Sequence, residues 1–276
     1  MPVSKANALV NKAKGYHDRG DNDNCMKYCN LAIQIDPNYA KGYFARALLL
    51  AEYELFEAAI ADFNKAMGLN FVNDLVLFHR ADAYMSIGNF KKAVSDLTQA
   101  MEYDPENPEI YRMRGAAYIQ LNFKNKAMED LNRALELDPY DPIAYYVRAT
   151  CYMMSNDITN TLENLNQAIK LEPGSPLTYF ARASIYESIG EKEKAEADFQ
   201  KAQELGYEED IFESLMEEFD DEEIYWQEDE EDDFEPERIF RVIDNRDKPE
   251  REVNTGDSEP KKSKKSKKGS KKKKKK

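Results

Sequence analysis

Residues 108–141 read PEIYRMRGAAYIQLNFKNKAMEDLNRALELDPYD, and this stretch decides the fold. Asn107 is a typical helix N-cap residue, because its side chain can accept a hydrogen bond from an otherwise unpaired N–H at the start of a helix. Pro108 suits the next position, where its missing N–H would have had no intrahelical partner. Large and small side chains then follow on one helical face: Tyr111, Gly115 and Tyr118.

A second helix is expected after a break near Asn122, a residue that tolerates the left-handed backbone of a tight turn. Its inner face would carry Ala127, Leu131 and Ala134, and Pro139 would end it. Each helix has about 14 residues and is about 21 Å long. The stretch therefore predicts a pair of antiparallel helices.

The same signals recur every 34 residues in three columns. The first column is an acidic residue before proline: Asp36-Pro37, Asp104-Pro105, Asp138-Pro139 and Glu172-Pro173. The second is arginine: Arg46, Arg80, Arg114, Arg148 and Arg182. The third is alanine: Ala32, Ala66, Ala100, Ala134, Ala168 and Ala202. Six units are therefore expected over residues 6–209: 6–39, 40–73, 74–107, 108–141, 142–175 and 176–209. One helix pair cannot bury its apolar face alone, so neighbouring units must stack.

At these residues the chain resembles the tetratricopeptide repeat (TPR) family, and the resemblance covers about three quarters of its length. It implies an all-α, right-handed superhelical solenoid of six antiparallel helix pairs, followed by a disordered, charged C-terminal tail. Three units depart from the family pattern. The first has Cys25 and Cys29 at small and Leu/Phe positions, the second has Phe71 in place of proline, and the fifth has Thr161 in place of alanine.

Each arginine of the repeat lies the same distance before the turn as an acidic or amide residue lies after it. Residues equidistant from the turn of an antiparallel pair lie opposite each other, which predicts four ion pairs: Arg46–Asp62, Arg80–Asp96, Arg114–Asp130 and Arg182–Asp198. Arg148 faces Asn164 instead. We interpret the pairs as structural contacts that fix how the two helices align. The alternative is a row of cations that binds an anionic ligand.

The resemblance also implies where a ligand binds, because the first helices of successive TPR units line a concave surface that usually holds peptides. Position 5 of the units gives an inner row: Phe44, Phe78, Arg112, Tyr146 and Phe180. Six residues flank it: Leu48, His79, Asp82, Met113, Thr150 and Met153. A peptide segment of another protein with apolar anchors would suit this surface. Packing between neighbouring units is the other role open to these aromatic residues.

Some TPR proteins clamp the terminal carboxylate of chaperones with Lys, Asn and Arg on the same helices. The corresponding positions here are Val10, Lys14, Ala45, Leu75 and His79. A carboxylate clamp for chaperones is therefore disfavoured.

Residues suited to catalysis are sparse. His17 and His79 do not form an acid–base or metal constellation by themselves. Cys25 and Cys29 share a helical face but lack the further ligands of a zinc site, so we interpret them as packing residues. Phosphate-binding loops, nucleophile elbows and HExxH motifs do not occur in the sequence. We expect no cofactor, and a non-catalytic scaffold or adaptor.

The C-terminal part has a different composition. Ile211, Phe212, Leu215, Met216 and Phe219 recur at helical spacing, which predicts a capping helix over 209–219 or, alternatively, a partner-binding amphipathic helix. The acidic segment 220–260 is expected to be mostly disordered.

Residues 261–276 contain 12 lysines and should form a disordered tail. This tail could make weak, non-specific contacts with polyanions, or fold back on the acidic segment. The alternative function is a nucleic-acid- or histone-associated factor that binds through these two charged segments.

The composition also limits the class of protein and the cellular compartment that we expect. Hydrophobic residues make up 42% of the chain, enough for a packed core, so a wholly disordered protein is excluded. Apolar runs long enough for a transmembrane helix or a signal peptide are missing. Three cysteines, two of them four residues apart, do not suggest a disulfide framework. We expect a cytoplasmic protein, or a nuclear one if the source is a eukaryote.

Overall fold

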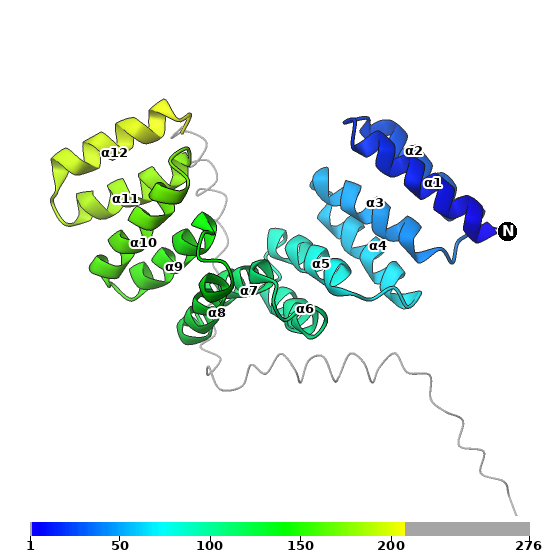
Figure 1. Ribbon diagram of the computed structural model, residues 1–276, viewed down its shortest axis with the longest axis horizontal. Coiled ribbons are helices and arrows are strands. Elements are labelled where there is room, and N and C mark those ends of the chain that lie inside the picture. The colour runs from blue at the N-terminus through cyan, green and yellow to red at the C-terminus, as the bar shows by residue number, and fades with distance from the viewer. Residues whose placement is uncertain (1, 208–276) are drawn as a thin grey trace, which may run out of the picture.

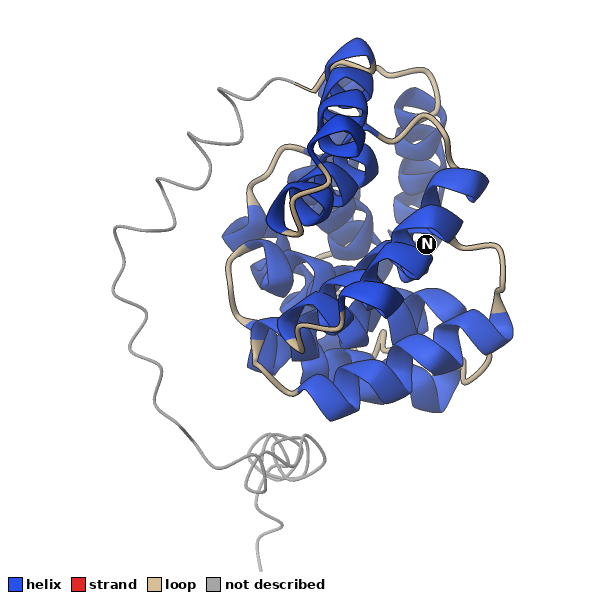
Figure 2. Ribbon diagram, turned by 90° about the vertical axis from the view of Figure 1, so that its left-hand side faces the viewer, coloured by secondary structure: helices blue, strands red, loops and turns tan. Residues whose placement is uncertain are grey.

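The computed structural model describes residues 2–207, and every regular element in that range is a helix (Figure 2). The predicted all-α solenoid is confirmed. Its helices are α1 (Pro2–His17), α2 (Asn22–Ile35), α3 (Ala40–Glu52), α4 (Phe56–Gly68), α5 (Asp74–Ser86), α6 (Phe90–Tyr103), α7 (Pro108–Gln120), α8 (Lys124–Leu137), α9 (Pro142–Met154), α10 (Ile158–Leu171), α11 (Pro176–Ser188) and α12 (Lys192–Glu204). The predictions for 209–219, 220–260 and 261–276 lie outside the described residues. In the described range, none of the helices has the length and apolar character needed to cross a bilayer.

The helices stack as six successive pairs that follow an arc (Figure 1). The two helices of a pair make the most extensive contacts, and each second helix then packs on the first helix of the next pair. The first helices α1, α3, α5, α7 and α9 also touch in succession, whereas the described second helices do not pack on one another in this way. Because elements on the inner side of a curved stack are the more crowded, the first helices line the concave side.

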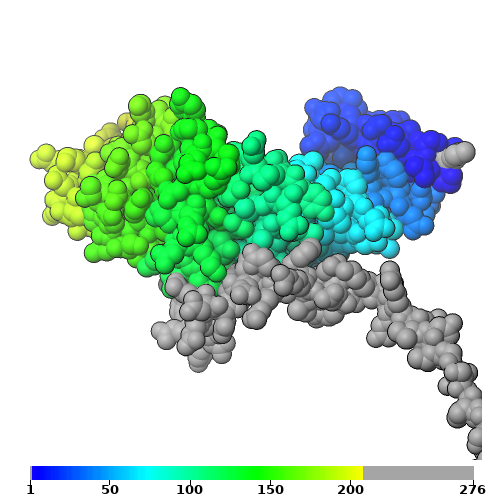
Figure 3. Space-filling view, turned by 60° about the horizontal axis from the view of Figure 1, so that its bottom comes forward, coloured from blue at the N-terminus to red at the C-terminus, as the bar shows by residue number. Residues whose placement is uncertain are grey.

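The space-filling view shows the resulting shape. Its surface is hollowed between the first unit, in dark blue, and the middle of the stack, in green (Figure 3). The stack therefore offers an inner surface to which several units contribute.

Capping side chains start several helices as the sequence predicts. Asn73 accepts a hydrogen bond from the Val76 N–H at 2.9 Å, and Asp141 accepts one from the Ile143 N–H at 2.8 Å. Ser175 precedes α11, but its hydroxyl bonds the hydroxyl of Thr178 at 2.9 Å, so it gives the helix no side-chain cap. Helix starts are thus fixed locally, by residues next to one another in the sequence.

The turn inside each pair uses a left-handed residue. Gly88 (φ 71°), Asn122 (φ 61°), Asn156 (φ 55°) and Gly190 (φ 79°) have the predicted conformation. Glu54 (φ 58°) takes this conformation in the second unit, at a residue type that adopts it less readily. These turns reverse the chain and set the second helix beside the first.

Small residues allow the helices of a pair to approach closely. At Gly115, an added Cβ would lie 2.9 Å from Cγ of Leu131, a side chain that is fully buried on the facing helix. The alanines of the third column are also buried: Ala32, Ala66, Ala100, Ala134, Ala168 and Ala202. The core therefore runs along the axis of the stack between the two rows of helices.

The helix end of the second unit, at Phe71, has a structure that the sequence did not predict. Phe71, where the first, third, fourth and fifth units have proline, donates its N–H to the Ala66 carbonyl at 3.1 Å, after Asn70 in the left-handed conformation (φ 63°). Its ring lies 5.5 Å from that of Phe44. The substitution thus replaces a proline stop with a hydrogen-bonded helix end and an aromatic contact.

The sixth unit ends in the same manner. Tyr207 donates its N–H to the Ala202 carbonyl at 2.9 Å after Gly206 (φ 90°), and its ring stacks on Phe180 at 4.4 Å. The end of this unit is also polar: Glu196 and Gln203 are exposed where earlier units carry apolar residues such as Leu162 and Leu135. A polar outer side of this kind is typical of the last unit of a repeat array.

Candidate functional site

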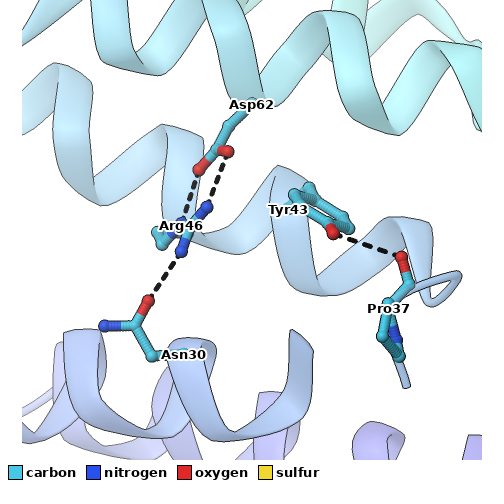
Figure 4. A network of polar contacts seen from close by, with 5 residues as sticks. All are labelled: Asn30, Pro37, Tyr43, Arg46 and Asp62. Atoms are coloured by element: carbon cyan, nitrogen blue, oxygen red, sulfur yellow. Dashed lines mark hydrogen bonds and ion pairs between the residues drawn. The ribbon is translucent and has the colours of Figure 1, made fainter. Parts of the chain in front are cut away.

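The arginine column connects three helices at each step (Figure 4). Arg46 in α3 donates from Nε and Nη2 to the two carboxylate oxygens of Asp62 in α4, at 2.6 and 2.8 Å. Its third nitrogen, Nη1, donates to Oδ1 of Asn30 in α2 at 2.7 Å. Each guanidinium therefore holds both helices of its own unit and the second helix of the preceding unit.

The same arrangement recurs along the stack. It consists of a two-pronged bond to a carboxylate and one bond to the unit before: Arg80 with Asp96 and Asn64, Arg114 with Asp130 and Thr98, and Arg182 with Asp198 and Asn166. Sequence reasoning placed the carboxylates correctly opposite the arginines but missed the contact to the preceding unit. A fourth column at the same spacing would have indicated it: Asn30, Asn64, Thr98, Asn132 and Asn166.

The burial of the arginine–aspartate pairs bears on whether they are structural contacts or a site for an anionic ligand. The four carboxylates are buried: Asp62, Asp96, Asp130 and Asp198. Hydrogen bonding to the aspartate raises the pKa of Arg46, and the same cause raises the pKa of Arg182. Because Nε and Nη2 of these four arginines are already bonded, their geometry favours a structural role over binding of an anionic ligand.

The predicted inner row is only partly accessible. The Phe44 ring lies 6.1 Å from Phe63 in its own unit and 6.3 Å from His79 in the next one. The Phe78 ring meets His79 edge-on at 5.5 Å. Tyr146 is half-buried against the core of the fifth and sixth units, and this burial raises the pKa of its phenol. These aromatic residues therefore pack between units and expose only part of their surface.

Arg112 does not provide an unpaired charge on this surface. Its Nε lies 2.8 Å from Oδ2 of Asp141, and both side chains are largely buried. Asp141 also caps α9, so the pair joins the fourth unit to the start of the fifth. The sequence identified Asp141 only as a cap, because nothing in the repeat spacing links it to Arg112.

The flanking residues differ in exposure. Leu48, His79, Met113 and Thr150 are half-buried, and the Thr150 hydroxyl donates to the Tyr146 carbonyl at 3.3 Å. Asp82 and Met153 are exposed, Met153 by 47%. Of the six flanking residues, these two are the ones a ligand could reach most easily.

Three exposed leucine and isoleucine side chains were missed as site residues. Leu75, Ile143 and Leu177 are 51%, 47% and 51% exposed, and all occupy the second position of their units. Each lies three residues before a member of the inner row and therefore on the same helical face. We call these three residues together with Met153 the apolar ladder. The spacing of 68 and 34 residues between Leu75, Ile143 and Leu177 was the signal that could have found these three.

A cavity of about 600 Å³ opens where α1 and α3 begin. Its walls include Val3, Asn7, Tyr39, Lys41 and Phe71. The Tyr39 hydroxyl donates to Asn7 Oδ1 at 2.8 Å, and the Lys41 ammonium lies 6.0 Å from the Phe71 ring. This cavity lies where the first two units meet, beside the segments that join one unit to the next.

The groups that could hold a metal or act as nucleophiles are scattered. Across residues 2–207, no cluster of three or more His, Cys, Asp or Glu side chains is suited to a metal ion. His17 Nε2 lies 2.6 Å from Glu52 Oε1. The thiols of Cys25, Cys29 and Cys151 are free and buried, and burial raises the pKa of Cys29 to about 12. A thiol with this pKa is a poor nucleophile at neutral pH.

Comparison with known proteins agrees with the repeat. Family patterns described as "TPR repeat" and "Tetratricopeptide repeat" match residues 81–122, 108–141, 6–39 and 177–205. No curated protein sequence shows a significant match.

Three solved structures illustrate the structural likeness. A tetratricopeptide repeat protein from Parabacteroides merdae is 21% identical, with a TM-score of 0.61 over 78% of this chain and 98% of its own. YrrB, described as a TPR protein with an unusual peptide-binding site, is 20% identical, with a TM-score of 0.56 over 63% of this chain and 90% of its own. MamA is 25% identical, with a TM-score of 0.52 over 60% of this chain and 91% of its own.

Proposed function

The chain belongs to the tetratricopeptide repeat family, and from this premise we propose that it is a non-catalytic scaffold or adaptor. Its ligand is a peptide segment of a partner protein, bound along the concave side of the stack. YrrB offers a parallel among the similar structures, since it is described as having a peptide-binding site.

The apolar ladder is the observation that carries the proposal. Single exposed apolar residues are common on any protein and need no explanation. Here, three of them recur at one position of three first helices, three residues before half-buried aromatic side chains. A repeated row of this kind matches the repeated apolar anchors of an extended or helical peptide.

The charges on the surface narrow the class of ligand. Arg112 is paired with Asp141, and the arginine column is bonded to the second helices. The exposed members of the apolar ladder in the fifth and sixth units, which carry no charge, are Ile143, Met153 and Leu177. We therefore expect a peptide with apolar anchors, and a salt dependence limited to its contacts with the exposed Asp82 carboxylate.

The test uses peptides selected for binding to the full chain from a displayed random library. Leu75, Ile143 and Leu177 are replaced together by serine, and each selected peptide is titrated against wild type and variant. Losing contacts of about 1 kcal/mol or more at each of two or three side chains weakens binding by about thirty-fold or more.

The matched control removes exposed apolar surface from second helices. Ile35 in α2 and Tyr103 in α6 are 42% and 50% exposed, and both are replaced by serine. Affinity within about two-fold of wild type is expected for this control. Equal binding by the wild type and the inner-surface variant would refute the proposed site.

A further inference from the structure

Arg148 differs from the other members of the arginine column. Its Nε donates to Asn164 Oδ1 at 2.8 Å, and its Nη1 donates to Asn132 Oδ1 at 2.9 Å, as the column predicts. In the four other units, Nη2 donates to a second carboxylate oxygen at 2.6 to 2.8 Å. The fifth unit has no such oxygen, because asparagine replaces aspartate there.

The second polar atom of Asn164 cannot take that place. Its Nδ2 is a donor and is bonded to the Asn160 carbonyl at 2.8 Å. Among residues 2–207, Arg148 Nη2 therefore has no hydrogen-bond acceptor. Arg148 as a whole is half-buried, and its bond to Asn132 lies in an exposed setting, so solvent reaches this end of the guanidinium.

The charge of Arg148 is unbalanced as well. In the other four units a buried aspartate neutralises the guanidinium. Around Arg148 the contacting groups are the neutral amides of Asn132 and Asn164 and the ring of Tyr145, 5.4 Å from the guanidinium carbon. One unit of positive charge thus meets solvent between α8 and α10, the second helices of the fourth and fifth units.

We propose that Arg148 is a binding site for a carboxylate group of an acidic protein segment. The other four units show which ligand fits, because a carboxylate oxygen accepts from Nη2 at this position in each of them. A single cation balances one carboxylate, whereas a phosphate dianion would need a second cation that Asn132, Asn164 and Tyr145 do not supply. Arg148 projects from the first helix α9 toward Asn132 in α8 and Asn164 in α10, the second helices of the fourth and fifth units, and none of these residues belongs to the apolar ladder.

Two sources could supply the carboxylate. One is an acidic segment of a partner. The other is this chain, in which residues 208–237 contain 18 acidic and no basic residues. The chemistry is the same in both cases, so the experiment has one arm for each source.

The experiment follows the arginine Nε–Hε signals of the full chain by NMR, with the Arg148 signal assigned from its loss in Arg148→Lys. In the first arm, hexaglutamate is titrated at low ionic strength. In the second, NaCl is raised from about 20 mM to about 500 mM without peptide, which releases an acidic segment already bound in the same chain. Binding from outside predicts a saturable shift of Arg148 in the first arm, and binding within the chain predicts a shift in the second.

Two variants make the result decisive. Asn164→Asp supplies the missing carboxylate, keeps Arg148 and copies the geometry of the other units, so it should abolish the response in both arms. Asp198→Asn recreates the fifth-unit arrangement around Arg182 and should make the Arg182 signal respond as well. A wild-type Arg148 signal that moves in neither arm, or that moves equally in Asn164→Asp, would overturn the proposal.

Discussion

At the scale of single residues, the arginine column shows how one side chain can link three helices. Arg114 bonds Asp130 through two nitrogens at 2.8 Å each and Thr98 of the preceding unit at 3.0 Å. Arg148 bonds the residues at the equivalent positions of its own and the preceding unit, but these are the neutral amides of Asn164 and Asn132. The two positions therefore separate the effect of the buried ion pair from that of the hydrogen bonds.

We predict that Arg114→Ala lowers the free energy of unfolding by about 3–5 kcal/mol, because it leaves the buried Asp130 charge unpaired. Arg148→Ala should cost about 1–3 kcal/mol, since it leaves only uncharged acceptors without a donor. Urea denaturation followed by circular dichroism measures both. Equal losses would show that the buried charge contributes nothing beyond its hydrogen bonds.

His79 makes the stability of the fold depend on pH. Burial against Phe44 and Phe78 lowers its pKa from 6.5, although the negative charges of Asp82 and Glu109 oppose this shift. The unfolded chain therefore binds a proton at this side chain before the folded chain does. The folded state loses stability as the pH falls below about 6.5, and the loss ends once the pH is below the lowered pKa.

The measurement compares melting temperatures at pH 7.5 and pH 5.5. His79→Gln should show a smaller decrease on acidification than wild type, while His17→Gln, at the exposed pair with Glu52, serves as the control. A wild-type decrease that the His79 variant leaves unchanged would mean that other groups cause it.

At the scale of helices, the sequence predicted what depends on neighbouring residues. Turns at Gly88 and Asn122 and the cap at Asn73 follow from the local preferences of glycine and asparagine. The contact between Arg112 and Asp141 was missed because it joins two units and follows no column of the repeat. The packing of Phe44 on His79 was left open for the same reason.

The helix end at Phe71 gives a prediction against the family pattern. Replacing Phe71 with proline restores the common residue, yet it should destabilise the protein by about 3 kcal/mol or more. Proline removes the N–H that bonds the Ala66 carbonyl and the ring that packs on Phe44, and it disfavours the conformation of Asn70 before it.

Phe71→Ala is the matched control, because it removes the ring and keeps the N–H. Its melting temperature should lie between those of wild type and Phe71→Pro. A proline variant as stable as wild type would show that the hydrogen-bonded helix end is dispensable.

At the scale of the whole molecule, the contacts between units decide whether the stack unfolds as one. Each arginine of the column reaches the preceding unit through a single bond from Nη1, as with Arg80 to Asn64 at 2.6 Å. The first unit has no arginine–aspartate pair, since Lys12 and Tyr28 occupy the corresponding positions. In a repeat array, stability is the sum of the units and their interfaces, so these bonds couple neighbours.

We predict that replacing the partners of Nη1 by alanine uncouples the units. The combined variant changes Asn30, Asn64, Asn132 and Asn166, which accept from the arginines of the following units. Each lost bond should cost about 1 kcal/mol, and the urea dependence of unfolding should become shallower as units unfold separately. A lower midpoint with an unchanged slope would contradict the coupling.

The overall arrangement followed from the 34-residue period, but the ligand-facing residues did not. The resemblance to the TPR family implied an inner row at position 5, but packing between units buries much of Phe44 and Phe78. Leu75 and Leu177 stay 51% exposed, whereas Phe44 packs on His79 of the next unit. Exposure on this surface results from side chains of different units acting together, which a single column does not record.

The most direct test of the concave surface as the ligand site is photo-crosslinking to a bound peptide. A photoreactive phenylalanine is placed at Ile143 on the apolar ladder or at Tyr103 on α6, in the otherwise unchanged full chain. With a peptide selected for binding, the account predicts a crosslinked product from position 143 and none above background from position 103. A product from position 103 alone would contradict it.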